Sequence, residues 1–202
     1  MYLKLIKPIF DFLFAVNVLI LISPVLLIIT ILLFIANHGS PFFFQKRPGK
    51  NERIFSIIKF KTMNEKRNSE GLLLPDAERL TKIGRFVRKT SLDELPQFIN
   101  VLIGDMSVVG PRPLLPEYLK VYTKEQKKRH LVKPGVTGLT QVSGRNNICW
   151  DEKFKFDIEY VNNVNMMLDI QIILKTFKKV ITSDGITAEG SQTSKKFDGR
   201  PK

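Results

Sequence analysis

Hydrophobic positions are distributed along this chain in two different ways. Residues 12–36 form an apolar run of 25 residues without one ionisable side chain. From residue 42 onward, apolar positions recur with strand or helix spacing between charged ones. The pattern therefore predicts a membrane-seeking segment, residues 1–37, followed by a compact domain, residues 38–202.

The apolar run is long enough to cross a bilayer, because 25 residues at ~1.5 Å each reach about 37 Å. It also exceeds the usual length of a signal-peptide core, which favours a retained segment. Ser23 and Pro24 lie at its middle, where proline bends or breaks a helix. Basic residues flank both ends, and positive charge prefers the cytoplasmic face. These features favour a re-entrant helix, broken at Ser23-Pro24, and a Pro-kinked span is the alternative.

The rest of the chain alternates short strands with helices. Alternating apolar residues around the Pro48-Gly49 turn predict two strands. Helical spacing and turn residues predict the other elements, and no series of strand–helix–strand units appears. The expected elements are strands at 42–47 and 53–60, a polar loop at 64–76, helices at 79–89 and 91–104, a short strand within 104–113, a helix at 117–130, a Gly-rich loop at 132–147, and helices at 150–163 and 166–181. The predicted fold class is α+β and α-rich, with a few short strands.

The helix expected at 166–181 is amphipathic. Its lysines lie away from a face that carries the apolar residues Met166, Ile170, Ile173, Leu174, Phe177 and Ile181. Such a face packs on a protein core or lies on a bilayer surface, and core packing is the commoner outcome.

Composition narrows the class of protein. The 32 Lys and Arg against 19 Asp and Glu give a net charge of +13. The apolar content excludes a disordered chain, and the lack of a second long apolar run excludes a polytopic membrane protein. Cys149 is the single cysteine, so no intramolecular disulfide can form. His38 and His130 are too far apart in sequence to suggest a zinc site, so any metal would be a hard cation on carboxylates.

A carboxylate pair, Asp93-Glu94, is the first candidate for chemistry. Ser91 and Glu94 have the spacing of a capping box, so the pair is equally well explained as the ordinary start of a helix. Arg85, Arg88 and Lys89 precede the pair and Arg112 follows it. Such surroundings are expected to keep Asp93 ionised, as a carboxylate nucleophile or a magnesium ligand requires.

Other basic positions suggest an anionic substrate. Arg112 lies between two prolines, which restrict its backbone and therefore the direction of its guanidinium. Such a guanidinium suits either bidentate binding of a phosphate or hydrogen bonds to loop carbonyls. Lys59 and Lys61 share one face of a strand, and Arg145 follows the Gly-rich loop. Asp157 and Asp169 are more typical of salt-bridge partners on helices. A cationic neighbourhood with carboxylates beside a bilayer anchor favours phosphoryl chemistry on a membrane-resident substrate.

Three motifs resemble one family. KFKTM (59–63), TSLDELPQFINVLIGDMSVVGPRP (90–113) and KPGVTGLTQVSGR (133–145) are similar to those of the bacterial sugar transferases, the monotopic polyprenyl-phosphate phosphoglycosyl transferases. The resemblance covers nearly the whole chain. It implies a re-entrant helix and an active site on the cytoplasmic face of the bacterial inner membrane, with amphipathic helices at the membrane interface. It also implies a Mg²⁺-dependent reaction in which a UDP-sugar and polyprenyl (undecaprenyl) phosphate give polyprenyl-diphosphate-sugar and UMP.

The resemblance also implies residue roles. Asp93 corresponds to the family's nucleophile, which forms a covalent phosphosugar intermediate and is a ligand for the metal, and Glu94 corresponds to its partner. Arg112 corresponds to the arginine that grips the substrate. The residues that correspond to other polar positions lining the site are Lys59, Arg88, Arg145 and Asp157.

Two residues depart from the family pattern, and both bear on the identity of the sugar. Leu139 stands where a tryptophan is frequent, and Ser143 where an asparagine is frequent. The chain looks most like the small transferases that start glycoprotein glycan assembly with an N-acetylated amino sugar and hand the product to downstream glycosyltransferases. The competing hypothesis is a membrane-anchored basic module that binds anionic lipid or nucleic acid. No nucleic-acid partner is expected, because a recognition-helix motif and interleaved aromatics are lacking.

Overall fold

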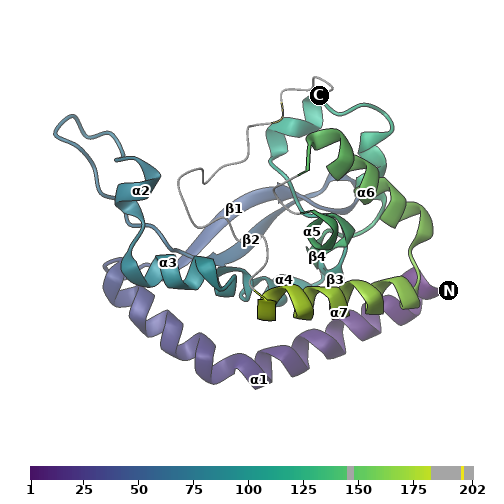
Figure 1. Cartoon of the computed structure of the whole chain (residues 1–202), viewed down its shortest axis with the longest axis horizontal. Helices are drawn as coiled ribbons and strands as arrows, with labels where there is room; N and C mark the ends of the chain where they lie inside the picture. The colour runs from purple at the N-terminus through teal and green to yellow at the C-terminus, as the bar shows by residue number, and fades with distance from the viewer. Residues whose placement is uncertain (145–147, 183–196, 198–202) are drawn as a thin grey trace.

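The computed structural model describes residues 1–144, 148–182 and 197. Within them the chain is α-rich with two small sheets, in agreement with the predicted fold class. Figure 1 shows the long helix α1 beneath the domain that holds the other helices and the sheets. The helices are α1 (Lys7–Ala36), α2 (Asp76–Arg79), α3 (Lys82–Lys89), α4 (Gln97–Leu102), α5 (Leu139–Ser143), α6 (Trp150–Asn163) and α7 (Met166–Thr182), and the strands are β1 (Phe42–Pro48), β2 (Ile54–Phe60), β3 (Ser107–Val109) and β4 (Gly135–Thr137).

Helix α1 is bent but continuous. It follows a short π-helical turn, η1 (Tyr2–Ile6), and runs through Pro24 without the expected break. The Ser23 hydroxyl donates a hydrogen bond to the Ile20 carbonyl at 2.8 Å, which supports the chain next to the proline. Figure 1 shows both ends of the bent helix directed toward the domain, with the middle farthest from it.

The two arms of α1 pack on different parts of the same domain. Ala15 in the first arm belongs to the main core cluster with Phe98 and Met106. Leu33 in the second arm belongs to another cluster with Val87. Between the arms the side chains face outward, and Leu21 is 80% exposed. The stretch Tyr2–Ala36 is long and apolar enough to cross a membrane, and most of it is not covered by protein.

The hairpin of β1 and β2 agrees with the sequence prediction. The strands are antiparallel, with Phe42 opposite Phe60 and Pro48 opposite Ile54. Alternating burial in β2 turns Phe55 and Ile57 into the core. The connection contains the short 3-10 turn η2 (Lys50–Glu52).

Two predictions for the middle of the chain were wrong. The expected helix at 117–130 is instead two 3-10 turns, η4 (Pro116–Lys120) and η5 (Gln126–Leu131). Thr123 and Gln126 exchange side-chain-to-backbone hydrogen bonds of 3.0 and 3.2 Å, so a new turn begins where the helix was expected to continue. The expected Gly-rich loop contains β4 and α5.

Strand β4 pairs with β3 in parallel, which local sequence did not indicate. Ser107 lies opposite Gly135 and Val109 opposite Thr137. A Cβ on Gly135 would lie 2.1 Å from the Gly110 nitrogen, so glycine is required where the two backbones meet. The pairing fixes the segment that leads into the Pro-Arg-Pro turn.

Helices α6 and α7 agree closely with the expected ranges, and α7 buries only part of the expected apolar face. It packs on the core through Ile172 and Ile173, with Asp169 also buried. Leu174 and Phe177, which were expected on the packed or bilayer-facing side, are exposed. The helix therefore both packs on the core and leaves apolar side chains outside it.

Candidate active site

The Asp93-Glu94 pair lies in the short connection between helices α3 and α4. Helix α3 begins at Lys82 rather than at residue 79, because Thr81 caps it by accepting a 2.9 Å hydrogen bond from the Gly84 nitrogen. The predicted single helix at 91–104 is a 3-10 turn, η3 (Leu92–Glu94), followed by α4.

The capping box that was the alternative explanation for Ser91 and Glu94 does not form. Ser91 has φ of 57°, and its nitrogen donates to the Arg88 carbonyl at 3.1 Å. Ser91 is therefore the left-handed residue that ends α3, whereas an N-cap residue has an extended backbone. Without that box, the capping explanation for Glu94 fails, and its carboxylate is available for partners from elsewhere in the fold.

Glu94 binds two cations that come from distant segments. Lys59 of β2 approaches Oε1 with its Nζ at 2.6 Å. Arg112 forms a bidentate pair, with Nη2 at 2.6 Å from Oε1 and Nη1 at 3.2 Å from Oε2. Burial alone would raise the pKa of Glu94, but Arg112 and Lys59 outweigh it and hold that pKa well below its usual range. Glu94 is therefore a fixed anion that aligns two cations.

Asp93 has a different environment. Within the described residues its carboxylate accepts no hydrogen bond, and its side chain is half-buried. Burial and the neighbouring Glu94 carboxylate raise the pKa of Asp93 to about 6, against the opposing effects of Lys59 and Arg112. With this pKa the Asp93 carboxylate is mainly ionised at neutral pH, although burial and Glu94 raise its pKa and the neighbouring cations only partly oppose that rise. An open, weakly stabilised carboxylate is suited to attack an electrophile.

A buried asparagine holds the two halves of this site together. Asn100 of α4 is fully buried, and both the oxygen and the nitrogen of its side-chain amide form hydrogen bonds to the backbone of β2. Its Oδ1 accepts from the Ile58 nitrogen at 2.9 Å, and its Nδ2 donates to the Ser56 carbonyl at 2.8 Å. The helix after Asp93-Glu94 is thereby fastened to the strand that carries Lys59.

The three other predicted site residues, Arg88, Asp157 and Arg145, lie in different places. Arg88, at the end of α3, is close enough to lower the pKa of Asp93. Asp157 of α6 is buried and paired with Arg129, whose Nη2 also donates to the Arg112 carbonyl at 2.6 Å, so Asp157 lies behind the Arg112 turn. Arg145 lies outside the described residues.

Two further arginines contact the Arg112 turn and were missed by sequence reasoning. Arg47 of β1 reaches the Pro113 carbonyl with Nη1 at 3.5 Å, and burial followed by repulsion from Arg112 lowers its pKa. Arg129 is 3% exposed. Nothing in the run Lys127, Lys128, Arg129 distinguishes the buried residue from its two exposed neighbours.

The carboxylates here fit a magnesium ion only in part. No group of three or more His, Cys, Asp or Glu suited to a metal occurs among the described residues. Both oxygens of Glu94 are occupied by cations, which leaves Asp93 as the open carboxylate. Mg²⁺ is commonly held by one or two carboxylates together with substrate phosphates, so Asp93 fits as a protein ligand for a metal brought by a diphosphate.

Comparison with known proteins shows the family to which the chain belongs. The family model described as "Bacterial sugar transferase" matches residues 2–183. The chain is 48% identical over 196 residues to the uncharacterized sugar transferase EpsL of Bacillus subtilis, covering 96% of both chains. It is 40% identical over 200 residues to an undecaprenyl-phosphate galactose phosphotransferase of Salmonella typhimurium, covering 90% of this chain and 42% of that one.

A third relative differs in the sugar that its name gives. The UDP-N-acetylgalactosamine-undecaprenyl-phosphate N-acetylgalactosaminephosphotransferase of Aeromonas hydrophila is 36% identical over 188 residues, covering 89% of this chain and 44% of that one. The chain thus spans nearly all of EpsL and less than half of the two longer relatives. The matched region contains the Asp93-Glu94 pair, its cations and the long apolar helix. The chain is therefore an enzyme that belongs to the bacterial sugar transferase family.

Proposed function

We propose that the chain transfers a sugar 1-phosphate from a UDP-sugar to undecaprenyl phosphate and releases UMP, as the first membrane step of polysaccharide assembly. The observation that carries this proposal is the pairing of unlike carboxylates. Glu94 is neutralised by Lys59 and Arg112, while Asp93 beside it remains open. Transfer to a lipid phosphate is also what the names of two relatives describe.

The reaction proceeds in two displacements at one phosphorus. An Asp93 carboxylate oxygen attacks the β-phosphorus of the UDP-sugar, the bond from that phosphorus to the bridging oxygen breaks, and UMP leaves with the electron pair. A phosphate oxygen of undecaprenyl phosphate then attacks the same phosphorus and releases the Asp93 carboxylate. Mg²⁺, when bound with the diphosphate, would neutralise part of the negative charge of the diphosphate.

The cations around Asp93 favour the anionic substrates. Arg112 keeps 45% of its side chain exposed while it holds Glu94, so its guanidinium remains accessible to a phosphate. Lys59 is more enclosed and faces the same carboxylate. Glu94 thereby holds two cations close to Asp93, and their charge favours binding of a diphosphate there.

For the sugar, we propose an N-acetylated amino sugar. The support is the resemblance of this short chain to the small transferases that use such sugars, and the N-acetylgalactosamine in the name of one relative. Galactose, which the name of another relative gives, is the competing donor. Comparing UMP release from UDP-N-acetylhexosamines with that from UDP-galactose and UDP-glucose distinguishes them. Faster turnover with UDP-galactose would contradict the proposal.

We also propose that α1 is re-entrant, with the active site on the cytoplasmic face of the inner membrane. Both ends of α1 bond to the same domain. Lys7 donates to Asp169 at 2.6 Å, and the Asn37 amide donates to the Lys61 carbonyl at 2.6 Å. A helix whose two ends are tied to one domain, with an exposed apolar middle, suits insertion from one side better than a full crossing.

The covalent step gives the test of the proposed function. The purified enzyme with UDP-sugar and Mg²⁺, but without undecaprenyl phosphate, is expected to release UMP up to one equivalent and to gain the mass of a phosphosugar. Asp93→Asn removes the nucleophile and should abolish both the burst and the mass increase. Asp76→Asn, on the exposed surface of α2, is the matched control and should leave both unchanged.

Rapid-quench assay of UMP and intact-protein mass spectrometry measure the two signals. UMP release that requires undecaprenyl phosphate, with no adduct on the protein, would show direct attack in a ternary complex and overturn the covalent step. No UMP release from any UDP-sugar, even with the lipid present, would overturn the proposed function itself.

A further inference from the structure

The Pro-Arg-Pro turn is held almost entirely through its carbonyl groups. Pro111 and Pro113 have no backbone N–H, so the turn cannot be fixed by ordinary ladder donors. Its three carbonyls accept from outside instead. Pro111 accepts from the Gly135 nitrogen at 3.0 Å, Arg112 from the Arg129 Nη2 at 2.6 Å, and Pro113 from the Arg47 Nη1 at 3.5 Å.

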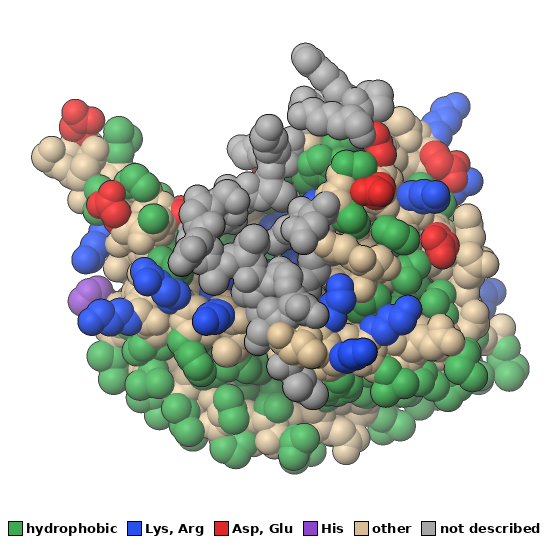
Figure 2. All heavy atoms as spheres, in the orientation of Figure 1, with side chains coloured by type: hydrophobic (Ala, Val, Ile, Leu, Met, Phe, Trp, Pro, Cys, Tyr) green, Lys and Arg blue, Asp and Glu red, His purple; other side chains and the backbone are tan. Residues whose placement is uncertain are grey.

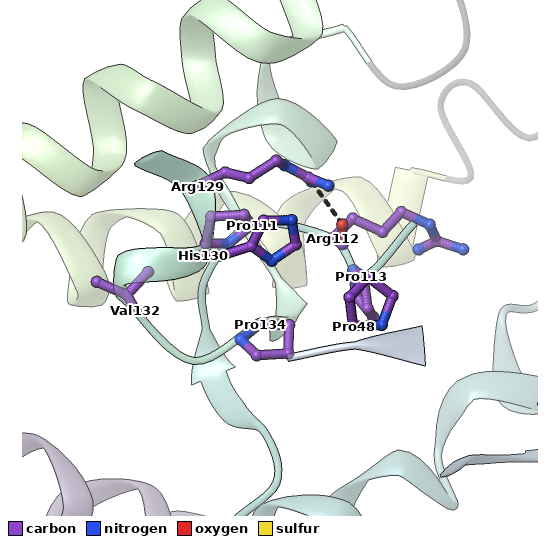
Figure 3. Close-up of a pocket in the computed structure, with 8 residues that line it drawn as sticks. All are labelled: Pro48, Pro111, Arg112, Pro113, Arg129, His130, Val132 and Pro134. Atoms are coloured by element: carbon purple, nitrogen blue, oxygen red, sulfur yellow. Dashed lines mark hydrogen bonds between the residues drawn. The ribbon is translucent and has the colours of Figure 1, made fainter. Parts of the chain in front are cut away.

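The bond from Arg129 is the shortest of the three. Figure 3 shows the Arg129 side chain reaching the Arg112 carbonyl, marked by the dashed line, while the Arg112 side chain points away from the pocket. The cavity behind the turn has a volume of about 10 Å³, which is near the minimum for one water molecule. The turn is thus backed by close packing, and the Arg129 guanidinium reaches its central carbonyl.

Arg129 is itself fully fixed. Its Nε and Nη2 lie 3.1 and 2.7 Å from Asp157 Oδ2, and its Nη1 donates to the Tyr122 hydroxyl at 3.2 Å. Thr140 in turn donates to the other Asp157 oxygen at 2.6 Å. A buried guanidinium is tolerated because the carboxylate compensates its charge. Its position is therefore set by α6 and α5, not by the exposed turn around it.

The free energy of unfolding alone does not explain why the buried ion pair of Arg129 and Asp157 is present. Hydrophobic residues of similar volume often replace such pairs at little or no cost in the free energy of unfolding. The contact that a hydrophobic pair could not reproduce is the donation to the Arg112 carbonyl. That bond fixes the main chain of the residue whose guanidinium grips Glu94 beside Asp93.

We propose that Arg129, neutralised by Asp157, is a positioning residue that holds the Arg112 backbone so that the Arg112 guanidinium meets Glu94 and the transferred phosphoryl group. This inference rests on the proposed function, because Arg112 must act on the reacting phosphate. Misplacement by about 1 Å can reduce a rate by about 100-fold, so a single main-chain bond behind the turn can control turnover.

The test is a double-mutant cycle. Arg129→Lys keeps the positive charge for Asp157 but lacks the planar fork that reaches the carboxylate and the Arg112 carbonyl together. We expect it to lower the rate of UMP release by at least ~10-fold, and to act on kcat more than on KM for the UDP-sugar. In an Arg112→Ala background the same change should cost less than ~2-fold, because the residue through which it acts is gone.

Single-turnover reactions with enzyme in excess keep the slow Arg112→Ala variants measurable. Tyr122→Phe is the matched control, since it removes another bond to Arg129 without touching the Arg112 carbonyl, and it should cost much less than Arg129→Lys. Equal losses from Arg129→Lys in the wild-type and Arg112→Ala backgrounds would overturn the inference and assign Arg129 a purely structural role.

A second variant tests the inference if the Arg129→Lys protein does not fold. The double change Arg129→Met and Asp157→Leu removes both charges together, so the thermal unfolding midpoint should stay near that of the wild type. UMP release should still fall by ~10-fold or more, and normal turnover in this folded variant would overturn the inference. Wild-type enzyme that releases no UMP from any UDP-sugar would instead refute the proposed function, so the two failures are distinct.

Discussion

At the scale of single residues, neighbouring side chains of one type acquire opposite properties. Asp93 and Glu94 are adjacent carboxylates, yet the pKa of one is raised and that of the other lowered. The difference arises because Lys59 and Arg112 both bond to Glu94 and neither bonds to Asp93. Chemistry at this site is therefore determined by which carboxylate the cations reach.

The bidentate geometry of Arg112 gives a first prediction at this scale. Arg112→Lys keeps the charge but cannot hold both oxygens of Glu94 or two oxygens of a phosphate. Loss of a charge-assisted contact of ~1.4 kcal/mol or more should reduce turnover at least ~10-fold, measured as UMP release. Arg85→Lys, on the exposed side of α3, is the matched control. Near-normal kinetics for Arg112→Lys would show that the residue only braces its turn.

His130 gives a prediction about pH. Burial, and then the charge of Arg129, lower the pKa of this imidazole to about 4, and its Nδ1 lies 3.1 Å from the Gly49 carbonyl, to which it must donate. The folded state therefore binds fewer protons than the unfolded state between pH 6.5 and 4, so stability falls as the pH drops through this range. The loss is on the order of 2 kcal/mol by pH 5.

The His130→Gln variant tests this prediction by comparing its stability with that of the wild type at different pH values. His130→Gln retains an uncharged donor, so its thermal unfolding midpoint should fall less than that of the wild type between pH 7 and pH 5. The contribution of His130 should be fully present above pH 6.5 and should disappear on acidification. Parallel pH profiles for the two proteins would contradict a neutral buried imidazole.

At the scale of elements, buried polar contacts hold the long apolar helix α1 to the domain. Asp169 of α7 is 1% exposed and accepts hydrogen bonds from Lys7 of α1, from Tyr2 before it and from Tyr160 of α6. Asp11 of α1 accepts from the Ser107 hydroxyl and the Val108 nitrogen of β3. The same strand leads into the Arg112 turn, so α1 and the site share one framework.

Breaking this buried contact should be costly. Asp169→Ala leaves the Lys7 ammonium buried without its partner, and such changes cost about 3–5 kcal/mol. We expect a clear decrease in the thermal unfolding midpoint of the detergent-solubilised protein. Glu52→Gln breaks the exposed pair with Lys127, whose charged atoms are 3.6 Å apart, and should change stability by less than ~1 kcal/mol. Equal effects of the two changes would show that the Asp169 contacts do not hold α1.

At the scale of the whole molecule, apolar and basic surfaces are arranged in layers. Figure 2 shows hydrophobic side chains gathered along the lower face, over α1, with Lys and Arg side chains immediately above them. A chain with net charge +13 and this arrangement is suited to an anionic leaflet, where each nearby cation contributes about 1 kcal/mol. The open carboxylate and its cations belong to the domain that rests on this surface.

The orientation of α1 can be tested with single cysteines. In a Cys149→Ser background, Leu3→Cys and Ser40→Cys place one thiol near each end of the helix. Both should be protected from an impermeant maleimide added to intact cells and should react after the cells are permeabilised. Labelling of Leu3→Cys from outside would show a full crossing and contradict the re-entrant form.

Sequence alone determined the features that depend on local pattern. The strands β1 and β2 follow from alternation around Pro48-Gly49, and α6 and α7 follow from helical periodicity. The apolar run and the candidate pair Asp93-Glu94 were likewise evident, because hydrophobic content and neighbouring residue types do not depend on the fold. Local reasoning was wrong for residues 117–130, where the reciprocal hydrogen bonds of Thr123 and Gln126 begin a new turn. It also left the capping box at Ser91 as an open alternative, and the structure rules that box out.

Only the tertiary structure decided which charges meet. Lys59 and Arg112 are 35 and 18 residues from Glu94 in sequence, and they reach it because Asn100 fastens α4 to β2 and the β3–β4 pairing fixes the Arg112 turn. Arg129 is buried while the lysines beside it are exposed, because Asp157, 28 residues away, compensates its charge. Burial and pairing of a charge depend on partners distant in sequence, and a local pattern contains no information about them.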